Sequence, residues 1–351
     1  MLPELHAVVP ADIDDPDRVS GGNAYDRRVL DGLRATGWVV TEHPVTGGWP
    51  RPDAAALERL AGVVAAVPEG GLLLVDGLVA SCAAPVLVPE VGRVRLVVLV
   101  HLPLGLSDPV AAQGERDVLL AASAVVTTSE WTRGVLLDTY ALVVDAVHVA
   151  QPGAARGAAS EGTHEGGQLL CVAAVTAHKG HADLAAALGL VADLSWSCVV
   201  AGALDREPAV VADLRQRLAR SGLADRVALV GALRGSALEE AYAAADLLVL
   251  PSHVETFGMV VTEALAHGVP VVASNVGGVP EALGHTGDGP AGLLVPVGRP
   301  DVLAAALRSW LTDPDERDRL RRRARRRRQD LSSWGHTVEQ VSAVLVGVRD
   351  A

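Results

Sequence analysis

Short apolar runs alternate with amphipathic segments along most of the chain. The runs at residues 247–250 and 271–273 have the length and the composition of buried parallel strands. A polar loop and a helix-length segment, from about 258 to 267, lie between them, and Gly268-Val269-Pro270 ends that helix. Residues 247–273 are therefore predicted to form a strand, loop, helix and strand, as a right-handed crossover between parallel strands requires.

The same alternation fills two stretches of ordinary domain size, and 351 residues exceed what a single core usually holds. The predicted fold class is α/β, with two Rossmann-like domains that each contain a doubly wound parallel sheet. Residues 153–167 are rich in Gly, Ala, Ser and Glu without periodicity, which predicts a linker. The expected division is 1–152 for the first domain, 153–167 for the linker, 168–330 for the second domain and 331–351 for a final helix.

Composition narrows the classes of function. A formal net charge of −12 argues against general nucleic-acid binding, which depends on neutralising phosphates. The three cysteines, at 82, 171 and 198, fit neither a disulfide framework nor a metal-binding pair, which favours a reducing compartment. No signal-peptide pattern and no apolar run of about 18–20 residues is visible. We therefore expect a soluble, cytoplasmic protein; the composition does not predict its oligomeric state.

The loop after residue 250 and the helix that follows contain the candidate ligand-binding groups. Glu255 and Glu263 are eight residues apart. If a helix starts near Gly258, Glu255 lies in front of it and Glu263 lies on its second turn, so the two carboxylates can contact two ends of one extended ligand. The helix N-terminus between them is an anion site, because its first backbone N–H groups have no partner within the helix. The predicted donors are the amides of Phe257, Gly258, Met259 and Val260. The alternative is a solvated loop and a surface helix residue.

This stretch resembles the signature of the retaining family 4 glycosyltransferases, which have the two-domain architecture called GT-B. The two glutamates at that spacing match, with a Phe-Gly pair between them, Pro-Ser before them, and then Gly-Val-Pro-Val-Val-Ala and Gly-Gly-x-Pro-Glu in order. The resemblance implies a nucleotide-sugar donor held mostly by the second domain. It implies no metal and no cofactor beyond the donor, and a C-terminal helix that crosses back to the first domain.

The resemblance also assigns roles in the second domain. Glu255 would hold a sugar hydroxyl and offset oxocarbenium charge, and Glu263 would bind the ribose hydroxyls. Lys179, beside a glycine at a strand-to-helix turn, would bind the diphosphate. The family commonly has an arginine five residues earlier, where this chain has Ala174. The backbone turn that ends at Leu233 would meet the nucleotide base without revealing which base.

In the first domain, Gly21 and Gly22 resemble the family's first glycine-rich loop, where phosphate or sugar can approach the backbone. His101 ends the most apolar strand and matches the family's histidine that faces the donor sugar. From its sequence position alone, this histidine is more typical of a structural residue. Glu255, Lys179 and His101 are the predicted catalytic residues.

The predicted reaction moves a hexosyl group from a nucleoside-diphosphate sugar, UDP-sugars being slightly favoured, to a hydroxyl of a small acceptor. Three alternatives stay open: a nucleotide-sugar 2-epimerase of the same architecture, a transferase with a lipid acceptor, and a sugar-nucleotide sensor without turnover. The lipid alternative depends on residues 314–329, a predicted helix rich in arginine. A solvated helix with acidic residues first is favoured there, and contact with anionic lipid is the other interpretation.

Overall fold

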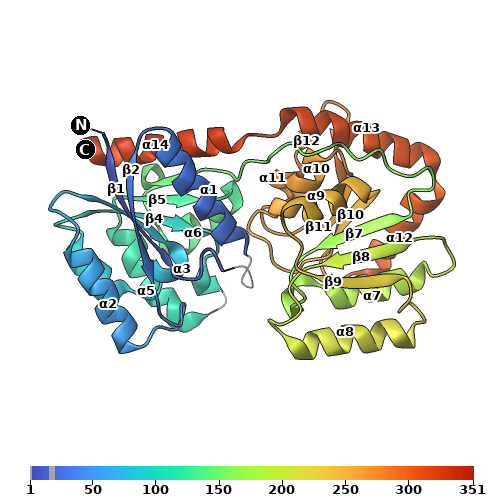
Figure 1. The fold of residues 1–351 in the computed structure, drawn as a ribbon, viewed down its shortest axis with the longest axis horizontal. Coiled ribbons are helices and arrows are strands. Elements are labelled where there is room, and N and C mark those ends of the chain that lie inside the picture. Colours follow the sequence, from blue (N-terminus) through green and yellow to red (C-terminus); the bar gives the residue numbers. More distant parts are fainter. Residues whose placement is uncertain (1, 16–19, 107) are drawn as a thin grey trace. The chain divides into compact units, whose positions relative to one another are not determined.

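A computed structural model describes residues 2–15, 20–106 and 108–351. The chain forms two compact units, one of Met1–Gly153 with Ser332–Ala351 and one of Ala154–Leu331 (Figure 1). Each unit contains a six-stranded sheet whose strand pairs are all parallel. The prediction of two Rossmann-like domains with parallel sheets is confirmed.

The sheet of the first unit has the order β2-β1-β3-β4-β5-β6. Its strands are β1 (Glu4–Pro10), β2 (Val39–Val45), β3 (Leu72–Asp76), β4 (Arg95–Val100), β5 (Ala124–Thr127) and β6 (Val147–Val149). Alternate residues of β4 enter different cores, since Val97 and Leu99 pack on one face and Leu96 and Val98 on the other. Both faces are thus buried, which explains why the strand is apolar throughout.

Helices cover both faces of this sheet. Helices α1 (Gly21–Ala35) and α14 (Trp334–Asp350) share one core with it. The other face carries α2 (Ala54–Ala65), α3 (Gly77–Ala80), α4 (Ala84–Leu87), α5 (Pro109–Ala121) and α6 (Glu130–Tyr140). Short 3-10 turns lie at η1 (Val88–Glu90), η2 (Leu104–Leu106) and η3 (Val144–Ala146).

The C-terminal helix α14 belongs to the first unit, as expected. The indole Nε1 of Trp38 donates to Ser342 Oγ at 3.0 Å, and Thr337 Oγ1 donates to the carbonyl of Gln151 at 2.8 Å. Gly32 of α1 allows the close approach, because a Cβ there would overlap Val338. The helix therefore completes the core of a unit that begins about 300 residues earlier in the sequence.

The sheet of the second unit has the order β14-β11-β10-β7-β8-β9. Its strands are β7 (Gln168–Val172), β8 (Ser197–Ala201), β9 (Val227–Gly231), β10 (Leu247–Leu250), β11 (Val271–Ser274) and β14 (Gly292–Val295), and β12 (His285–Thr286) pairs antiparallel with β13 (Gly289–Pro290). The first strand in sequence, β7, lies between β8 and β10. The chain order reverses there, and ligands of open α/β sheets bind at the carboxyl ends of strands beside such a reversal.

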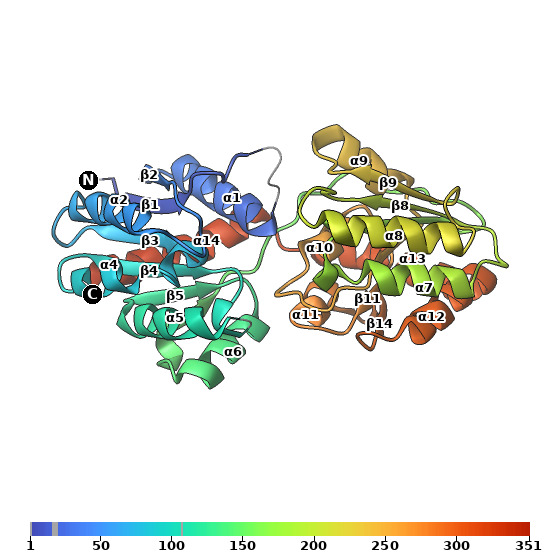
Figure 2. The same ribbon diagram turned by 90° about the horizontal axis from the view of Figure 1, so that it is seen from below.

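Helices flank this sheet as well (Figure 2). One core contains α7 (His181–Leu190), α8 (Pro208–Arg220) and α12 (Pro300–Thr312), and the other contains α9 (Gly235–Ala244), α10 (Met259–Ala266) and α11 (Val279–Leu283). Helix α13 (Pro314–Asp330) contributes one buried residue to each core, and η4 (Ala177–Lys179) is a single 3-10 turn before α7.

Residues 153–167 are predicted as a linker; in the structure, the part from Ala154 onward belongs to the second unit and packs on it. Asp246 is 1% exposed, and its carboxylate accepts bonds from Thr163 Oγ1 at 2.6 Å and from the backbone N–H of Gln168 at 2.8 Å. Ser160 Oγ also donates to the carbonyl of Ala245 at 2.8 Å. A buried carboxylate needs such donors, and the polar residues that suggested a linker supply them.

Helix α13 is an integrated part of the second unit rather than a solvated helix. Seven of its nine arginines bond to protein groups. Arg327 donates to the carbonyl of Leu283 at 3.2 Å, and Arg328 donates to that of Ala266 at 2.7 Å; these are the last residues of α11 and α10. Cations are favoured at helix C-termini, so Arg327 and Arg328 cap the two neighbouring helices. Among the described helices, none combines the length and the apolar character needed to cross a membrane.

Replacing Arg328 with methionine should lower the free energy of unfolding by about 1–3 kcal/mol, because the carbonyls of Ala266 and Gly157 lose their donor. The matched control is Arg322→Met on the same helix, where the side chain is exposed and a change within about 0.5 kcal/mol is expected. Chemical denaturation of both variants measures the difference. Equal effects would contradict the capping role.

Candidate active site

Lys179 and Glu255 form an ion pair at the carboxyl ends of β7 and β10, two neighbouring strands of the second unit. The ammonium Nζ lies 2.6 Å from Glu255 Oε1, and Ser252 Oγ donates to the same oxygen at 2.9 Å. The side chains are only 22% and 12% exposed. The structure therefore brings together two residues that are 76 positions apart and for which the sequence analysis predicts separate ligand groups.

Glycines let the loops around this pair touch backbone to backbone. Gly180 has φ +70°, and a Cβ there would overlap the carbonyl of Pro251. Gly277 has φ +55°, and a Cβ there would overlap the carbonyl of Glu255. The oxygen of that carbonyl accepts a hydrogen bond from the N–H of Gly278 at 3.3 Å. The Gly-Gly pair of the motif thus supports the backbone that carries Glu255.

Gly277→Ala should cost about 2–4 kcal/mol of unfolding free energy, because both the left-handed φ and the overlap with the carbonyl of Glu255 oppose a Cβ. Gly298→Ala is the control: φ is +66° there, but no atom lies within 4 Å of the added Cβ, so only about 1 kcal/mol is expected. Urea unfolding of both variants measures the two costs. If the two variants lose the same unfolding free energy, the overlap with the carbonyl of Glu255 adds no cost at Gly277.

The helix after this loop begins where the sequence predicts. Gly258, at φ +89°, is the N-cap of α10, and Met259 is the first helical residue. Glu255 precedes the helix and Glu263 is on its second turn. The side chain of Phe257 is 4% exposed and packs in the core, so it anchors the loop. The backbone amides of this first turn lie where the sequence predicts an anion site.

Glu263 has a partner that the sequence analysis misses. Tyr242 Oη donates to Glu263 Oε2 at 2.7 Å, and the tyrosine ring stacks on His267 with centroids 5.2 Å apart. Burial, and then the Glu263 carboxylate, raise the pKa of Tyr242 well above its usual value, so the hydroxyl stays a donor. The tyrosine holds the carboxylate from within the core that α9 and α10 share. A tyrosine on the buried face of α9 is the only signal in the sequence.

Two other positions bear on the predicted binding of the nucleotide. Leu233 is half-buried in the turn between β9 and α9, and β9 is separated from β7 by β8. Ala174 lies in the loop after β7, where its carbonyl accepts from the N–H of Thr176 at 2.9 Å. The loop after β8 contributes a carboxylate here, since Glu207 Oε2 accepts from the N–H of Ala177 at 3.1 Å. Lys179 is the cation that pairs with Glu255 at 2.6 Å.

In the first unit, His101 follows β4 and lies against the start of α1. Gly21 and Gly22 are the first residues of that helix, and Ser20 caps it by accepting from the N–H of Asn23 at 3.0 Å. A Cβ added to Gly22 would lie 3.2 Å from Cδ2 of the His101 ring. Gly22 and His101, which the resemblance links to one ligand, are therefore direct neighbours.

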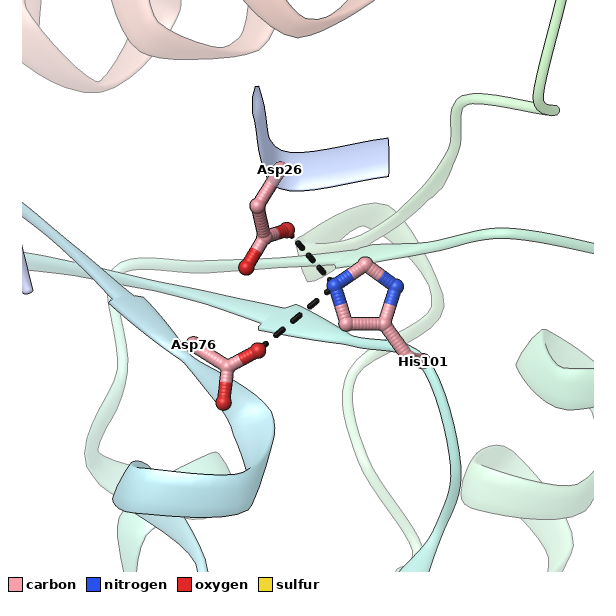
Figure 3. A group of neighbouring side chains, drawn as sticks. All are labelled: Asp26, Asp76 and His101. Carbon is pink, nitrogen blue, oxygen red and sulfur yellow. Dashed lines mark hydrogen bonds and ion pairs between the residues drawn. The ribbon is translucent and has the colours of Figure 1, made fainter. Parts of the chain in front are cut away.

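Two buried aspartates hold His101, and the sequence analysis misses both (Figure 3). His101 Nε2 lies 2.6 Å from Asp26 Oδ1 and 3.6 Å from Asp76 Oδ2. Burial, and then the charge of Asp26, raise the pKa of Asp76 to about 7. Burial lowers the pKa of His101, but the charges of Asp26 and Asp76 and the hydrogen bond to Asp26 raise it, and the net shift is upward.

Within the described residues, Asp26, Asp76 and His101 are the one group whose potential ligand atoms lie close enough for a metal ion, all within 4.8 Å. The contact of 2.6 Å between Nε2 and Asp26 has the length of a charge-assisted hydrogen bond. We therefore interpret the group as a hydrogen-bonded network. The expectation that the protein uses no metal stays a prediction.

Comparison with known proteins decides the family. Residues 159–327, most of the second unit, match the family model described as glycosyl transferases group 1. A D-inositol 3-phosphate glycosyltransferase of Jonesia denitrificans is 31% identical over 258 residues, 68% of this chain and 60% of that protein. The chain belongs to the glycosyl transferases group 1 family. The family inferred from residues 251–281 is thus confirmed. The chain spans 60% of the length of that relative and 31% of a second one of the same name, from Kineococcus radiotolerans.

Solved structures show a likeness of fold that also covers the first unit. A sucrose-phosphate synthase from Thermosynechococcus elongatus aligns with a TM-score of 0.79 at 21% identity, over 98% of each chain. The Anabaena protein HepE in complex with UDP-glucose aligns with a TM-score of 0.77 at 17% identity, over 98% of this chain and 99% of that chain. At such identities the likeness shows the fold, which is the GT-B fold of this glycosyl transferase family.

Proposed function

We propose that this protein is a retaining glycosyltransferase that moves a hexosyl group from a nucleoside-diphosphate sugar to a hydroxyl of a small acceptor. The observation that carries the proposal is the Lys179–Glu255 pair, which lies where the strand order of the second sheet reverses and directly before the N-terminus of α10. Cation, carboxylate and free amides at one sheet edge suit the phosphates and hydroxyls of a nucleotide-sugar.

Lys179 can hold the diphosphate without releasing Glu255. An ammonium has three N–H donors, and one of them is used by Glu255 Oε1. The remaining donors and the first amides of α10 would stabilise the charge that develops on the departing diphosphate. Lys179 and Ser252 both bind Oε1, so they fix the carboxylate and orient Oε2 toward a sugar hydroxyl. The departing phosphate would then take the proton of the acceptor hydroxyl.

Glu263 would accept hydrogen bonds from the ribose hydroxyls, with Tyr242 holding the carboxylate from behind. His101 keeps the role that the family resemblance implies, a hydrogen bond to the transferred sugar. Leu233 would meet the base through its backbone. These roles use no metal and no cofactor other than the donor.

Tyr242→Phe should weaken the affinity for UDP by about 3- to 10-fold, because Glu263 loses the donor that orients it. The loss should be smaller for 2′-deoxy-UDP, which offers one ribose hydroxyl fewer. Tyr140→Phe is the matched control, since Tyr140 Oη also donates to a buried carboxylate, Glu115, at 2.6 Å in the first unit. Calorimetric titration of both variants with both nucleotides measures the effect. An equal loss for the two nucleotides would contradict the role of Glu263.

The relatives indicate which substrates to test first. One is a D-inositol 3-phosphate glycosyltransferase, one is a sucrose-phosphate synthase, and the HepE structure holds UDP-glucose. We infer that the acceptor is a cyclitol, a sugar or one of their phosphates, and that UDP-glucose is a suitable first donor. A lipid acceptor has less support, because most arginines of α13 already bond within the second unit.

The test is incubation with UDP-, GDP-, ADP- and dTDP-sugars and a panel of cyclitol, sugar and sugar-phosphate acceptors without added metal. The proposal predicts an acceptor whose mass rises by one hexosyl residue, and NMR coupling constants that show the anomeric configuration of the donor. A donor converted to an isomer of equal mass would identify a 2-epimerase instead. Binding without any turnover would identify a sensor.

A further inference from the structure

Three titratable side chains from three elements meet at one edge of the first sheet. Asp26 lies in α1, Asp76 ends β3 and His101 follows β4. Figure 3 shows both carboxylates directed at Nε2 of the imidazole, while Nδ1 lies on the far side of the ring. The sheet order β2-β1-β3-β4 reverses between β1 and β3, so the group occupies the position where α/β sheets place their ligand sites.

Burial restricts the charge that this group can carry. The side chains of Asp26 and Asp76 are 4% and 7% exposed, and that of His101 is 17% exposed. Two ionised carboxylates beside a neutral imidazole would bury a charge of −2, which a low-dielectric site strongly disfavours. One proton shared by the carboxyls and one more on the imidazole give a net charge of zero. Carboxylates held this close do share a proton in other proteins.

We propose that Asp26 and Asp76 share one proton and hold His101 as an imidazolium whose Nδ1–H is a fixed donor for a ligand oxygen. The aspartates are positioning residues, because they act through the histidine. The ligand class rests on the proposed function: the oxygen would belong to a sugar hydroxyl or a phosphate. An imidazolium cannot accept a proton, so His101 would act as a hydrogen-bond donor rather than a general base at neutral pH.

The surroundings of the ring fit this assignment. Tyr25 meets it edge-on at 5.2 Å between centroids and donates its own hydroxyl to the carbonyl of Ala150 at 2.7 Å. Burial, and then Asp26, raise the pKa of Tyr25, so it stays neutral. Asp26 is both a charged neighbour and a hydrogen-bond partner of Asp76. The charges of the two aspartates raise the pKa of His101. Gly22 leaves room for the ring, because a Cβ at that position would lie 3.2 Å from its Cδ2.

The test is a pH titration of the full-length protein labelled with ¹⁵N-histidine, followed by long-range ¹H–¹⁵N NMR. His101→Gln identifies the His101 signals among those of the eleven histidines. In the wild type, both ring nitrogens of His101 should remain protonated at pH 7. Asp76→Asn should preserve that state, because the neutral amide takes the place of the shared proton and Asp26 still supplies one negative charge.

The double variant Asp26→Asn/Asp76→Asn should lower the His101 pKa by about one unit or more, since only burial then acts on the ring. A wild-type His101 that is neutral at pH 7 would overturn the proposal, and so would a double variant with an unchanged titration. Loss of the Nε2 proton on adding Zn²⁺ or Mg²⁺ would overturn it in favour of a metal site. The experiment needs no donor or acceptor, so a protonated His101 without any transferase activity would refute the proposed function alone.

Discussion

Glu255→Gln should lower the turnover number of hexosyl transfer by about 10²- to 10³-fold and change the affinity for the nucleoside diphosphate by less than about threefold. The glutamine keeps the shape of the side chain and an oxygen that can accept from Lys179 and Ser252. What it removes is the negative charge that offsets the oxocarbenium character of the transferred sugar. That charge matters in the transition state and hardly at all in nucleotide binding.

Glu207→Gln is the matched control for this result. Glu207 is another carboxylate beside the Lys179 loop, but it accepts from the backbone N–H of Ala177 and has no proposed contact with the sugar. Its turnover number should stay within about twofold of the wild type. Steady-state kinetics and calorimetric UDP titration of both variants give the comparison. A Glu255→Gln enzyme with near-normal turnover would remove the glutamate from the mechanism.

Lys179→Met should weaken the binding of nucleoside diphosphates by about 10- to 100-fold, because a charge-assisted contact to phosphate is lost. The single variant should also lose about 1–3 kcal/mol of stability, since Glu255 is left 12% exposed without its cation. These two effects have different causes. Calorimetric titration with UDP and chemical denaturation measure them separately.

The double variant Lys179→Met/Glu255→Gln separates stability from binding. With the carboxylate neutralised, most of the lost stability should return, whereas the weak affinity for UDP should persist. Uridine, which has no phosphate, should bind the wild type and the double variant alike. A double variant that binds UDP as tightly as the wild type would show that Lys179 serves only to neutralise Glu255.

Local pattern predicts the elements around the site well. Apolar runs at both ends of residues 247–273, with Gly268-Val269-Pro270 between helix and strand, are enough to predict β10, α10 and β11. The start of the helix at Met259 follows in the same way, and with it the positions of Glu255 and Glu263. The packing of α14 on the first unit is predicted by the family resemblance and not by any pattern in residues 331–351.

The partners of the site residues could not be predicted, because sheet order decides them. Lys179 meets Glu255 only because β7 and β10 are neighbours, and no feature of either loop encodes that pairing. Asp26 lies in an amphipathic segment where a charged residue is expected to face solvent, yet it is 3% exposed. The polar stretch 154–167 predicts a linker for the same reason: its partner, Asp246, is about 80 residues away in the sequence and is itself buried.

The proposed function requires that the second unit binds nucleotide-sugars directly. The measurement that tests it is calorimetric titration of the full-length protein with UDP-, GDP-, ADP- and dTDP-sugars in the presence of EDTA, repeated on Lys179→Met/Glu255→Gln. We expect the wild type to bind one nucleotide class saturably and the double variant to bind it with an affinity lower by about 10-fold or more. Binding of none of these donors by the wild type, or equal affinities for the two proteins, would contradict it.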